Sequence, residues 1–394
     1  MNKRKVYLDN SATTQVRKEV LDAMIPYFTE IYGNASSVHT YGQEAKQALT
    51  KSREKFAKLI NAQFAEEIIF TSCGTESDNI SIVGSLLANE GKHIITSKIE
   101  HHAVLYTCQN LEKKGYKVDY ISVNKSGRIN LEELNNKITD DTVIVSIMHA
   151  NNEIGVIEPI EEISKILEEK NKNRKNKILL HTDAVQTAGK LKLDVQKLGI
   201  DLLSVSGHKF YGPKGIGALY IRKGTKISPL FHGGHHEFGM RPGTENIAEI
   251  VGMTKALELA NEELEEESKK IYTLRNKLMD GIVAKIPDVV INTDIKYAVP
   301  SVLSVSFNCI EGESLLLMLD VAQIAASAGS ACATGSSEPS HVLSAIGATP
   351  IAAQGTLRFS LGRYNTQEDI DYVLDVLPKL VKKVRQMSPV WNNR

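Results

Sequence analysis

The stretch that decides the fold is LLSVSGHKFYGPKG, residues 202–215, an apolar run that leads directly into glycines, a histidine and a lysine. Residues 202–205 predict a buried strand. Lys209 follows closely, and burial lowers the pKa of a lysine, because an ammonium is costly to desolvate. A lysine that forms a Schiff base requires such a lowered pKa. For this segment alone an exposed loop lysine is the simpler interpretation, so the neighbouring strand ends decide between the two.

Five more apolar runs precede this strand and alternate with helical patterns. Strands are predicted at 68–71, 93–96, 118–123, 143–147 and 178–181, and helices at 76–89, 102–114, 131–138 and 159–170. Such alternation is typical of an α/β fold in which a mainly parallel sheet is flanked by helices. Ligands of these sheets bind beyond the carboxyl ends of the strands. The candidate residues of this chain follow those strand ends.

The second part of the chain predicts a smaller α/β domain. A charged helix is expected over 244–275, with the run 261–270 as a solvated helix face. Beyond it, strands are predicted at 302–307 and 356–361, and helices at 313–321, 338–346 and 367–385. We therefore expect a large cofactor-binding domain over 16–262 and a small domain made of 1–15 and 263–394. A length of 394 residues suits two domains.

Composition and charge exclude several classes of partner. Lysine plus arginine equals aspartate plus glutamate, 47 of each, so we expect no nucleic acid and no membrane surface as partner. No apolar run approaches the roughly 20 residues that cross a bilayer. The cysteines, Cys73, Cys108, Cys309 and Cys332, are too scattered for a disulfide framework or a zinc site. A cytoplasmic location is expected, and each cysteine is by default a small buried residue.

Three further strand ends carry polar residues that suit a pyridoxal cofactor. Asp183 could keep a pyridinium nitrogen protonated, although a helix cap explains it equally well. Residues 71–77, TSCGTES, could present backbone N–H groups to a phosphate, although a capping box would look similar. His101 or His102 could lie over a planar ring or move protons, although paired histidines are usually structural or exposed.

Together these motifs resemble the cysteine desulfurases of the NifS and IscS type, within the fold-type-I pyridoxal-phosphate enzymes. The matching segments run from end to end: LDNSATT 8–14, TSCGTES 71–77, EH 100–101, MHANNE 148–153, DAVQ 183–186, SGHKFYGPKG 206–215, RPGTEN 241–246, GSAC 329–332, EPSH 338–341 and RFSLGR 358–363. Two positions depart from the pattern, Ala35 in an Asn-Ala-Ser turn and Ala333 after the cysteine. Neither carries an essential group, and the sequence does not assign the chain to one branch.

The resemblance implies a role for each matching residue. Lys209 would bind pyridoxal 5'-phosphate covalently, Asp183 would pair with its ring nitrogen, and His101 would stack on the ring and move protons. Arg358 would hold the substrate carboxylate, a task that suits a planar guanidinium. The cofactor phosphate would contact Gly74, Thr75, Ser206 and His208, and also Thr244 of the partner subunit in a homodimer. The ring hydroxyl or the substrate would contact Asn152 and Gln186.

Cys332 separates this activity from its relatives. It lies among small residues at 327–337, a composition that predicts a mobile loop. The resemblance implies that Cys332 takes sulfur from L-cysteine as a persulfide, with release of L-alanine. An iron–sulfur scaffold protein or another acceptor would receive the sulfur. No metal is expected in the resting enzyme, and Cys332 would meet iron only in a transferred iron–sulfur cluster.

Three alternatives stay open. A selenocysteine lyase could use the same groups, and another class-V pyridoxal-phosphate enzyme, such as an aminotransferase, would need no thiol. A non-catalytic sulfur carrier or scaffold could keep the fold. The joint presence of Lys209, Asp183 and Arg358 argues against that last alternative, because a chain that had lost its activity would usually have lost residues of the cofactor site.

Overall fold

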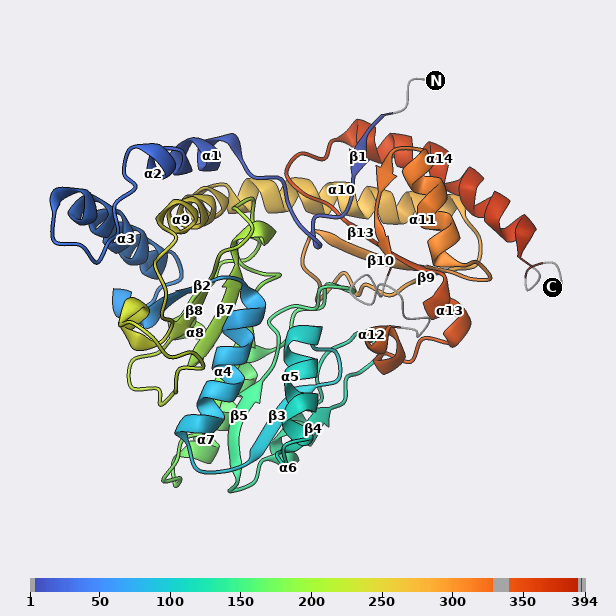
Figure 1. Cartoon of the computed structure of the whole chain (residues 1–394). Coiled ribbons are helices and arrows are strands. Elements are labelled where there is room, and N and C mark those ends of the chain that lie inside the picture. The colour runs from blue at the N-terminus through green and yellow to red at the C-terminus, as the bar shows by residue number, and fades with distance from the viewer. Residues whose placement is uncertain (1–3, 329–339, 389–390, 392–394) are drawn as a thin grey trace.

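A seven-stranded sheet forms the centre of the larger half of the molecule (Figure 1). The computed structural model describes residues 4–328, 340–388 and 391. The strand order is β2-β8-β7-β6-β5-β3-β4. The strands are β2 (Ile68–Thr71), β3 (His93–Ser97), β4 (Lys117–Ile121), β5 (Thr142–Ser146), β6 (Leu179–Asp183), β7 (Leu202–Ser206) and β8 (Gly217–Ile221). Among these only β8 runs against its neighbours, so the prediction of a mainly parallel sheet is confirmed.

The strand β8 was not predicted from the sequence. It begins with Gly217 and Ala218, which have little preference for strands, and it follows a turn rich in glycine and proline. The other six strands lie within one or two residues of their predicted positions. Five of these six strands are buried throughout, which explains why apolar runs identified them, whereas β4 is only partly buried.

Helices cover both faces of this sheet. Alternate strand residues point to opposite faces, so Leu179 packs in one hydrophobic cluster and Leu180 in another. The face of Leu179 is covered by α4 (Gly74–Ala88) and α5 (His102–Glu112), which lie in front of the sheet in Figure 1. The opposite face is covered by α1 (Lys18–Met24), α3 (Thr40–Leu59), α7 (Ile160–Asn171), α8 (Val195–Leu198) and α9 (Ile247–Glu262). Two short helices complete this half, α2 (Pro26–Thr29) and α6 (Leu131–Lys137).

The single charged helix predicted over 244–275 is wrong. The chain forms two helices there, α9 and α10 (Leu264–Lys285), with Glu263 at the junction. The run 261–270 is also more than a solvated face, because its glutamates make ion pairs. The Glu263 carboxylate accepts hydrogen bonds from Arg17 at 2.8 Å and from Arg363 at 2.6 Å. These contacts join residues far apart in the sequence, which a helical pattern alone does not reveal.

The smaller half is built on an antiparallel sheet with the order β12-β13-β10-β9. Its strands are β9 (Val289–Ile291), β10 (Val302–Phe307), β12 (Ser327–Ala328) and β13 (Thr356–Ser360), and its helices are α10, α11 (Gly312–Val321), α12 (His341–Ala345), α13 (Pro350–Gln354) and α14 (Gln367–Met387). The N-terminal strand β1 (Val6–Tyr7) joins this half by pairing with β11 (Ile324–Ala325). Val6 and Leu8 belong to its hydrophobic cluster. The domain limits of 16–262, 1–15 and 263–394 stay a prediction.

None of the described helices is both long and apolar enough to cross a membrane.

Candidate active site

A cavity of about 240 Å³ lies where the two halves meet. Its walls are made by Ser11, Ala12, Cys73, Gly74, Thr75, Asp78, His101, Met148, Asn152, Asp183, Val185, Gln186, Ser206, His208, Lys209 and Arg358. The predicted site residues are all among them, except Thr244 and Cys332. The structure thus brings together residues from the ends of β5, β6 and β7, the starts of α4 and α5, the strand β13 and the N-terminal segment. Their individual roles stay predictions.

Lys209 ends a 3₁₀ turn, Gly207–Lys209, that follows β7 directly. Its Nζ donates hydrogen bonds to the backbone carbonyls of Ser11 and Ala12, both at 2.8 Å. His208 Nδ1 lies 3.1 Å from Thr13 Oγ1. Burial, followed by the charge of Lys209, lowers the pKa of His208 to about 4, so its imidazole is neutral. The N-terminal segment therefore forms one wall around the lysine.

Asp183 is the last residue of β6 and is buried. One carboxylate oxygen accepts a hydrogen bond from the backbone N–H of Val185 at 2.9 Å. Burial raises the pKa of Asp183 to about 6, and the nearby charge of Lys209 acts in the opposite direction. A buried carboxylate of this kind is stabilised by a cationic partner. A protonated pyridine nitrogen would be such a partner.

The start of α4 also lines the cavity. Its N-cap is Cys73, whose side chain makes no capping hydrogen bond within the described residues. Backbone N–H groups at this helix start are suited to bind an anion. A Cβ atom at Gly74 would lie 2.7 Å from the Val185 side chain, so only glycine fits there. Ser206, at the end of β7, lies beside this helix start, because a Cβ at Gly74 would lie 3.6 Å from its Cβ; His208 lines the same cavity.

His101 is the N-cap of α5 and lines the cavity, whereas its neighbour His102 does not. His101 Nδ1 accepts a hydrogen bond from the Ala103 N–H at 3.1 Å, which leaves the proton of the neutral ring on Nε2. Burial lowers the pKa of His101 to about 4, so the ring is neutral near pH 7. His102 instead stacks on Tyr106 with ring centres 4.6 Å apart. Only the first histidine of the pair is therefore placed for chemistry in the cavity.

Arg358, on β13, contributes a buried guanidinium from the smaller half. It donates hydrogen bonds to the Asn152 carbonyl at 2.8 Å and to Asp9 Oδ1 at 3.0 Å. Its Nε is buried and has no hydrogen-bond partner within the described residues, and the side chain lines the cavity, where a guanidinium suits a ligand carboxylate. Asp9 also accepts a hydrogen bond from Ser327 Oγ at 2.7 Å. The sequence motif that contains Asp9 was noted, but its contact with Arg358 was missed because the two lie far apart in the chain.

Gln186 is oriented by a second lysine. Its Nε2 donates a hydrogen bond to the Ser11 carbonyl at 3.0 Å, and its Oε1 accepts one from Lys190 Nζ at 3.1 Å. Burial lowers the pKa of Lys190 to about 7. Sequence reasoning missed Lys190, although its spacing of four residues from Gln186 places the two on the same side of a helical turn.

Two predicted site residues lie elsewhere. Thr244 is exposed on the segment before α9 and does not line the cavity of its own chain. Cys332 lies outside the described residues. Of the other cysteines, Cys108 and Cys309 are buried, and burial raises the pKa of Cys108 to about 12. Cys73 lines the cavity, which the sequence did not indicate.

The residues of the cavity fit pyridoxal phosphate. The start of α4 suits the phosphate, Asp183 suits the ring nitrogen, and Lys209 suits the aldehyde carbon. The steric limit at Gly74 and the Arg358 guanidinium in the cavity wall agree with a site shaped for a phosphorylated ligand and a carboxylate. This fold and this site define the class of fold-type-I pyridoxal-phosphate enzymes.

Comparison with known proteins agrees with this class of enzyme and narrows it to one family. The sequence profile described as "Aminotransferase class-V" matches residues 6–373. The chain is 52% identical to "Cysteine desulfurase IscS" of Clostridium botulinum (strain Hall), covering 100% of this chain and 98% of that protein. It is 54% identical to "Cysteine desulfurase IscS" of Methanosarcina thermophila, covering 98% and 94%. A solved structure named "NIFS-LIKE PROTEIN" is 43% identical, with a TM-score of 0.90, and covers 96% of this chain and 100% of that chain.

The chain therefore belongs to the cysteine desulfurases of the class-V aminotransferase family, and its cofactor is the pyridoxal phosphate on which that family depends. The resemblance found in the sequence is confirmed.

Proposed function

We propose that this protein converts L-cysteine to L-alanine and takes the sulfur onto Cys332 as a persulfide. The observation that carries the proposal is the convergence of Lys209, Asp183, His101 and Arg358 on one cavity. These groups come from both halves of the molecule. Together they can bind an amino acid by its carboxylate and act on the bonds next to its α-carbon.

Each residue has a task that its surroundings allow. Arg358 binds the substrate carboxylate, and its contact with Asp9 fixes the plane of the guanidinium. Pyridoxal phosphate supplies an electron sink for the bonds at the substrate α-carbon. Asp183 holds the ring nitrogen protonated, Lys209 moves the proton of the α-carbon, and neutral His101 carries a proton on Nε2 that it can donate.

The sulfur transfer needs a thiolate, and Cys332 supplies it in this proposal. A bond forms between Cys332 Sγ and the substrate sulfur while the substrate carbon–sulfur bond breaks. The carbon then takes up a proton and becomes the methyl group of alanine. The serines on either side of 329–339 support a role for Cys332 at the cavity. Ser327 Oγ donates a hydrogen bond to Asp9 Oδ1 at 2.7 Å, and Ser340 Oγ donates one to Glu153 Oε2 at 2.5 Å. Both contacts lie beside residues that wall the cavity.

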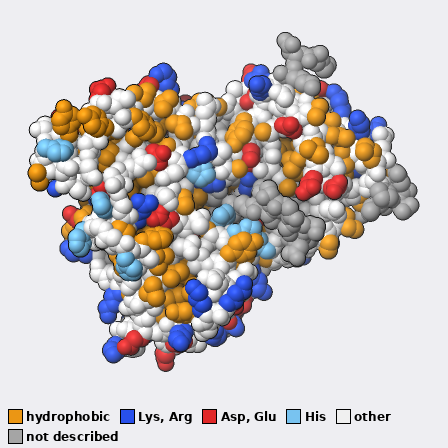
Figure 2. Space-filling model, viewed as in Figure 1, with side chains coloured by type: hydrophobic (Ala, Val, Ile, Leu, Met, Phe, Trp, Pro, Cys, Tyr) orange, Lys and Arg blue, Asp and Glu red, His pale blue; other side chains and the backbone are white. Residues whose placement is uncertain are grey.

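We also propose a homodimer in which Thr244 completes the phosphate site of the other copy. Exposed hydrophobic side chains gather over α1 to α3, and Figure 2 shows this patch at the upper left. They are Leu21, Ile25, Phe28, Tyr32 and Tyr41, each between 48% and 65% exposed. Such a patch marks an interaction site, and a second copy is the occupant that also explains exposed Thr244.

The partner that receives sulfur is proposed to be an iron–sulfur scaffold protein or another acceptor. The name IscS of the relatives points to iron–sulfur assembly. A cytoplasmic location belongs to the same proposal, because a reducing compartment keeps a reactive thiol available.

The test is to give the purified, cofactor-loaded protein L-cysteine or L-selenocysteine and to measure alanine. We expect steady alanine formation from L-cysteine. Alanine from L-selenocysteine alone would assign a selenocysteine lyase. Cofactor absorbance with no turnover of either substrate would assign another class-V activity, and a protein that binds no cofactor would be a non-catalytic carrier.

A further inference from the structure

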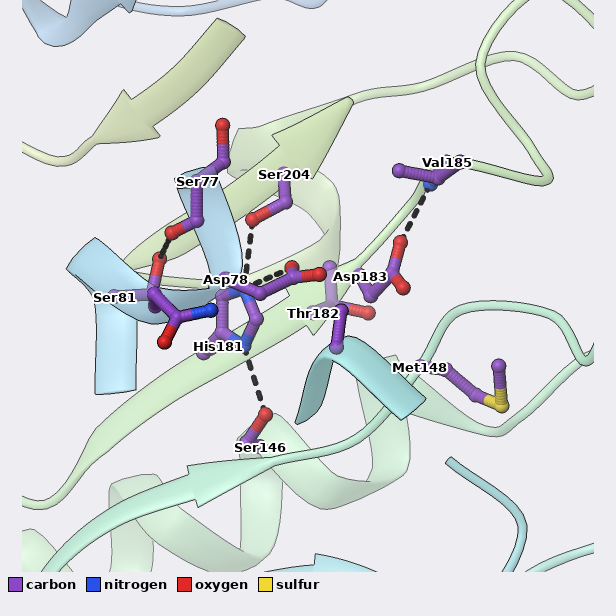
Figure 3. Close-up of polar contacts among 12 residues, drawn as sticks. Ser77, Asp78, Ser81, Ser146, Met148, His181, Thr182, Asp183, Val185 and Ser204 are labelled. Carbon is purple, nitrogen blue, oxygen red and sulfur yellow. Dashed lines mark hydrogen bonds and ion pairs between the residues drawn. The ribbon is translucent and has the colours of Figure 1, made fainter. Parts of the chain in front are cut away.

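A second buried carboxyl group lies in the cavity near Asp183. Asp78, on α4, is 1% exposed and forms part of the cavity wall. Its Oδ1 has no hydrogen-bond partner within the described residues and lies 3.6 Å from His181 Nε2 (Figure 3). The proposed reaction assigns no task to this group. An unpaired carboxylate in such a place would be costly, so its protonation state needs an explanation.

His181 does not provide a positive charge for Asp78. It lies on β6, fully buried, with Nδ1 2.8 Å from Ser146 Oγ and Nε2 3.0 Å from Ser204 Oγ. Figure 3 shows the ring held between these two hydroxyls. Burial lowers the pKa of His181 to about 3, so the imidazole is neutral. Its contact with Asp78 is therefore not an ion pair near neutral pH.

The other groups that face Asp78 also disfavour its ionisation. Burial raises the pKa of Asp78 well above its ordinary value, and the charge of Asp183 adds to that effect. Glu100 and Cys73 act in the same direction, and only a hydrogen bond with Ser204 acts against it. Two neighbouring buried carboxyls do not both ionise, because like charges repel strongly where water is absent.

The contacts of the two carboxyls decide which one keeps the proton. Asp183 Oδ1 accepts the Val185 N–H, a hydrogen bond that favours the ionised form. Asp78 Oδ1 has no donor in the described part of the chain, and the hydrogen bond that acts on this carboxyl is the one with the Ser204 hydroxyl. The charge of Lys209 also favours ionised Asp183. The negative charge therefore belongs on Asp183 and the proton on Asp78.

We propose that Asp78 holds a proton beside Asp183, so that the pair presents a single negative charge to the ring nitrogen of the cofactor. Asp78 is a positioning residue, because it acts through Asp183. This inference rests on the proposed function, since it concerns the same cofactor site. One negative charge matches one protonated pyridine nitrogen, whereas two would leave a carboxylate buried without a partner.

The proton can be observed directly by infrared spectroscopy of the cofactor-loaded protein near pH 8. The difference spectrum of wild type minus Asp78→Asn should contain the carbonyl band of a protonated carboxylic acid. Other buried acids, such as Glu100, are present in both samples and cancel. Ser81→Ala, also buried on α4, is the matched control and should show no such band. A difference spectrum with carboxylate bands alone would overturn the proposal.

Cofactor affinity gives a second readout. Asparagine resembles a protonated aspartate, so Asp78→Asn should change the cofactor dissociation constant by no more than about threefold. Asp183→Asn removes the charge and should weaken binding by about tenfold or more. Equal losses in the two variants would overturn the proposal. If Asp78→Asn does not fold, Asp78→Ser serves for the same spectrum. An intact acid band in a protein that makes no alanine would contradict the proposed function alone.

Discussion

Two walls of the cavity are built in different ways. The sheet wall, Asp183, Ser206, His208 and Lys209, follows two adjacent parallel strands within a short stretch of the chain. The arginine wall is made of Asn152 and Arg358, together with Asp9, which contacts Arg358; these contacts join segments separated by 206 and 349 residues. The first depends on the buried core of one sheet, and the second on contacts between segments far apart in the chain, one of which, from Arg358 to Asn152, joins the two halves. Changes in the sheet wall should therefore affect chemistry, and changes in the arginine wall should mainly affect substrate binding.

The largest effect is expected at Lys209 in the sheet wall. Lys209→Ala removes the group that moves the substrate proton, so alanine formation should fall by about 10²–10⁴-fold or more. Exposed Lys214, five residues further on, is the matched control, and Lys214→Ala should keep its rate. Borohydride reduction followed by peptide mapping should find the cofactor on Lys209. Cofactor attached to Lys214 would show that the lysine is wrongly assigned.

Substitutions in the arginine wall should change KM more than they change kcat. Arg358→Lys keeps the charge but loses the planar fork, so KM for L-cysteine should rise by about 10- to 100-fold. Asp9→Asn leaves Arg358 in place with a weaker contact and should raise KM by about threefold to tenfold. Steady-state kinetics measures both. An unchanged KM with a strongly reduced kcat would assign the arginine wall to chemistry and remove the distinction between the walls.

Glu100 lies behind the cavity, and its burial leads us to expect that the stability of the protein depends on pH. It is fully buried, and burial raises its pKa from 4.5 to about 8. Between these pH values the unfolded chain has released a proton that the folded protein still binds, so stability falls as pH rises and levels off above about 8.

Glu100→Gln should remove this pH dependence of the stability. The variant should match wild type near pH 5 and exceed its Tm near pH 8 by on the order of 5 °C. Thermal denaturation across that range is the measurement, and exposed Glu266→Gln is the control that should follow wild type at every pH. A constant Tm difference between Glu100→Gln and wild type would mean that Glu100 is already ionised when folded.

The smallest effect is expected at Lys190, which supports the sheet wall through Gln186. Lys190→Met removes the hydrogen bond that orients the Gln186 amide, so the cofactor dissociation constant should rise by about threefold. Exposed Lys192→Met is the control. Fluorescence titration with pyridoxal phosphate measures both variants. An equal change in the two would show that the amide does not depend on Lys190.

The sequence predicted the sheet wall better than the arginine wall, for a physical reason. Parallel strands are buried on both faces, so their apolar runs locate the strand ends where Asp183 and Lys209 lie. The contact between Arg358 and Asp9 leaves no local pattern, because it joins two segments that are 349 residues apart in the chain. Family resemblance gave Arg358 a role, but it gave none to Asp9, although Asp9 lies in the matching segment 8–14.

Two other features could not be predicted from the sequence, for similar reasons. The break at Glu263 depends on ion pairs with distant arginines, and helical periodicity continues through it. Asp78 sits within an ordinary helix start, where an acidic residue is commonplace. Only the fold shows that it faces Asp183 and His181.

The central claim is that sulfur from L-cysteine passes to Cys332. Mass spectrometry of the protein after brief treatment with L-cysteine tests it most directly, by locating the added sulfur on a peptide. The account predicts one extra sulfur atom on Cys332, none on Cys108 or Cys309, and loss of steady sulfur release in Cys332→Ala. Cys73 is the critical internal comparison, since it lines the cavity. Sulfur found on Cys73 and not on Cys332, or wild-type turnover by Cys332→Ala, would contradict the account.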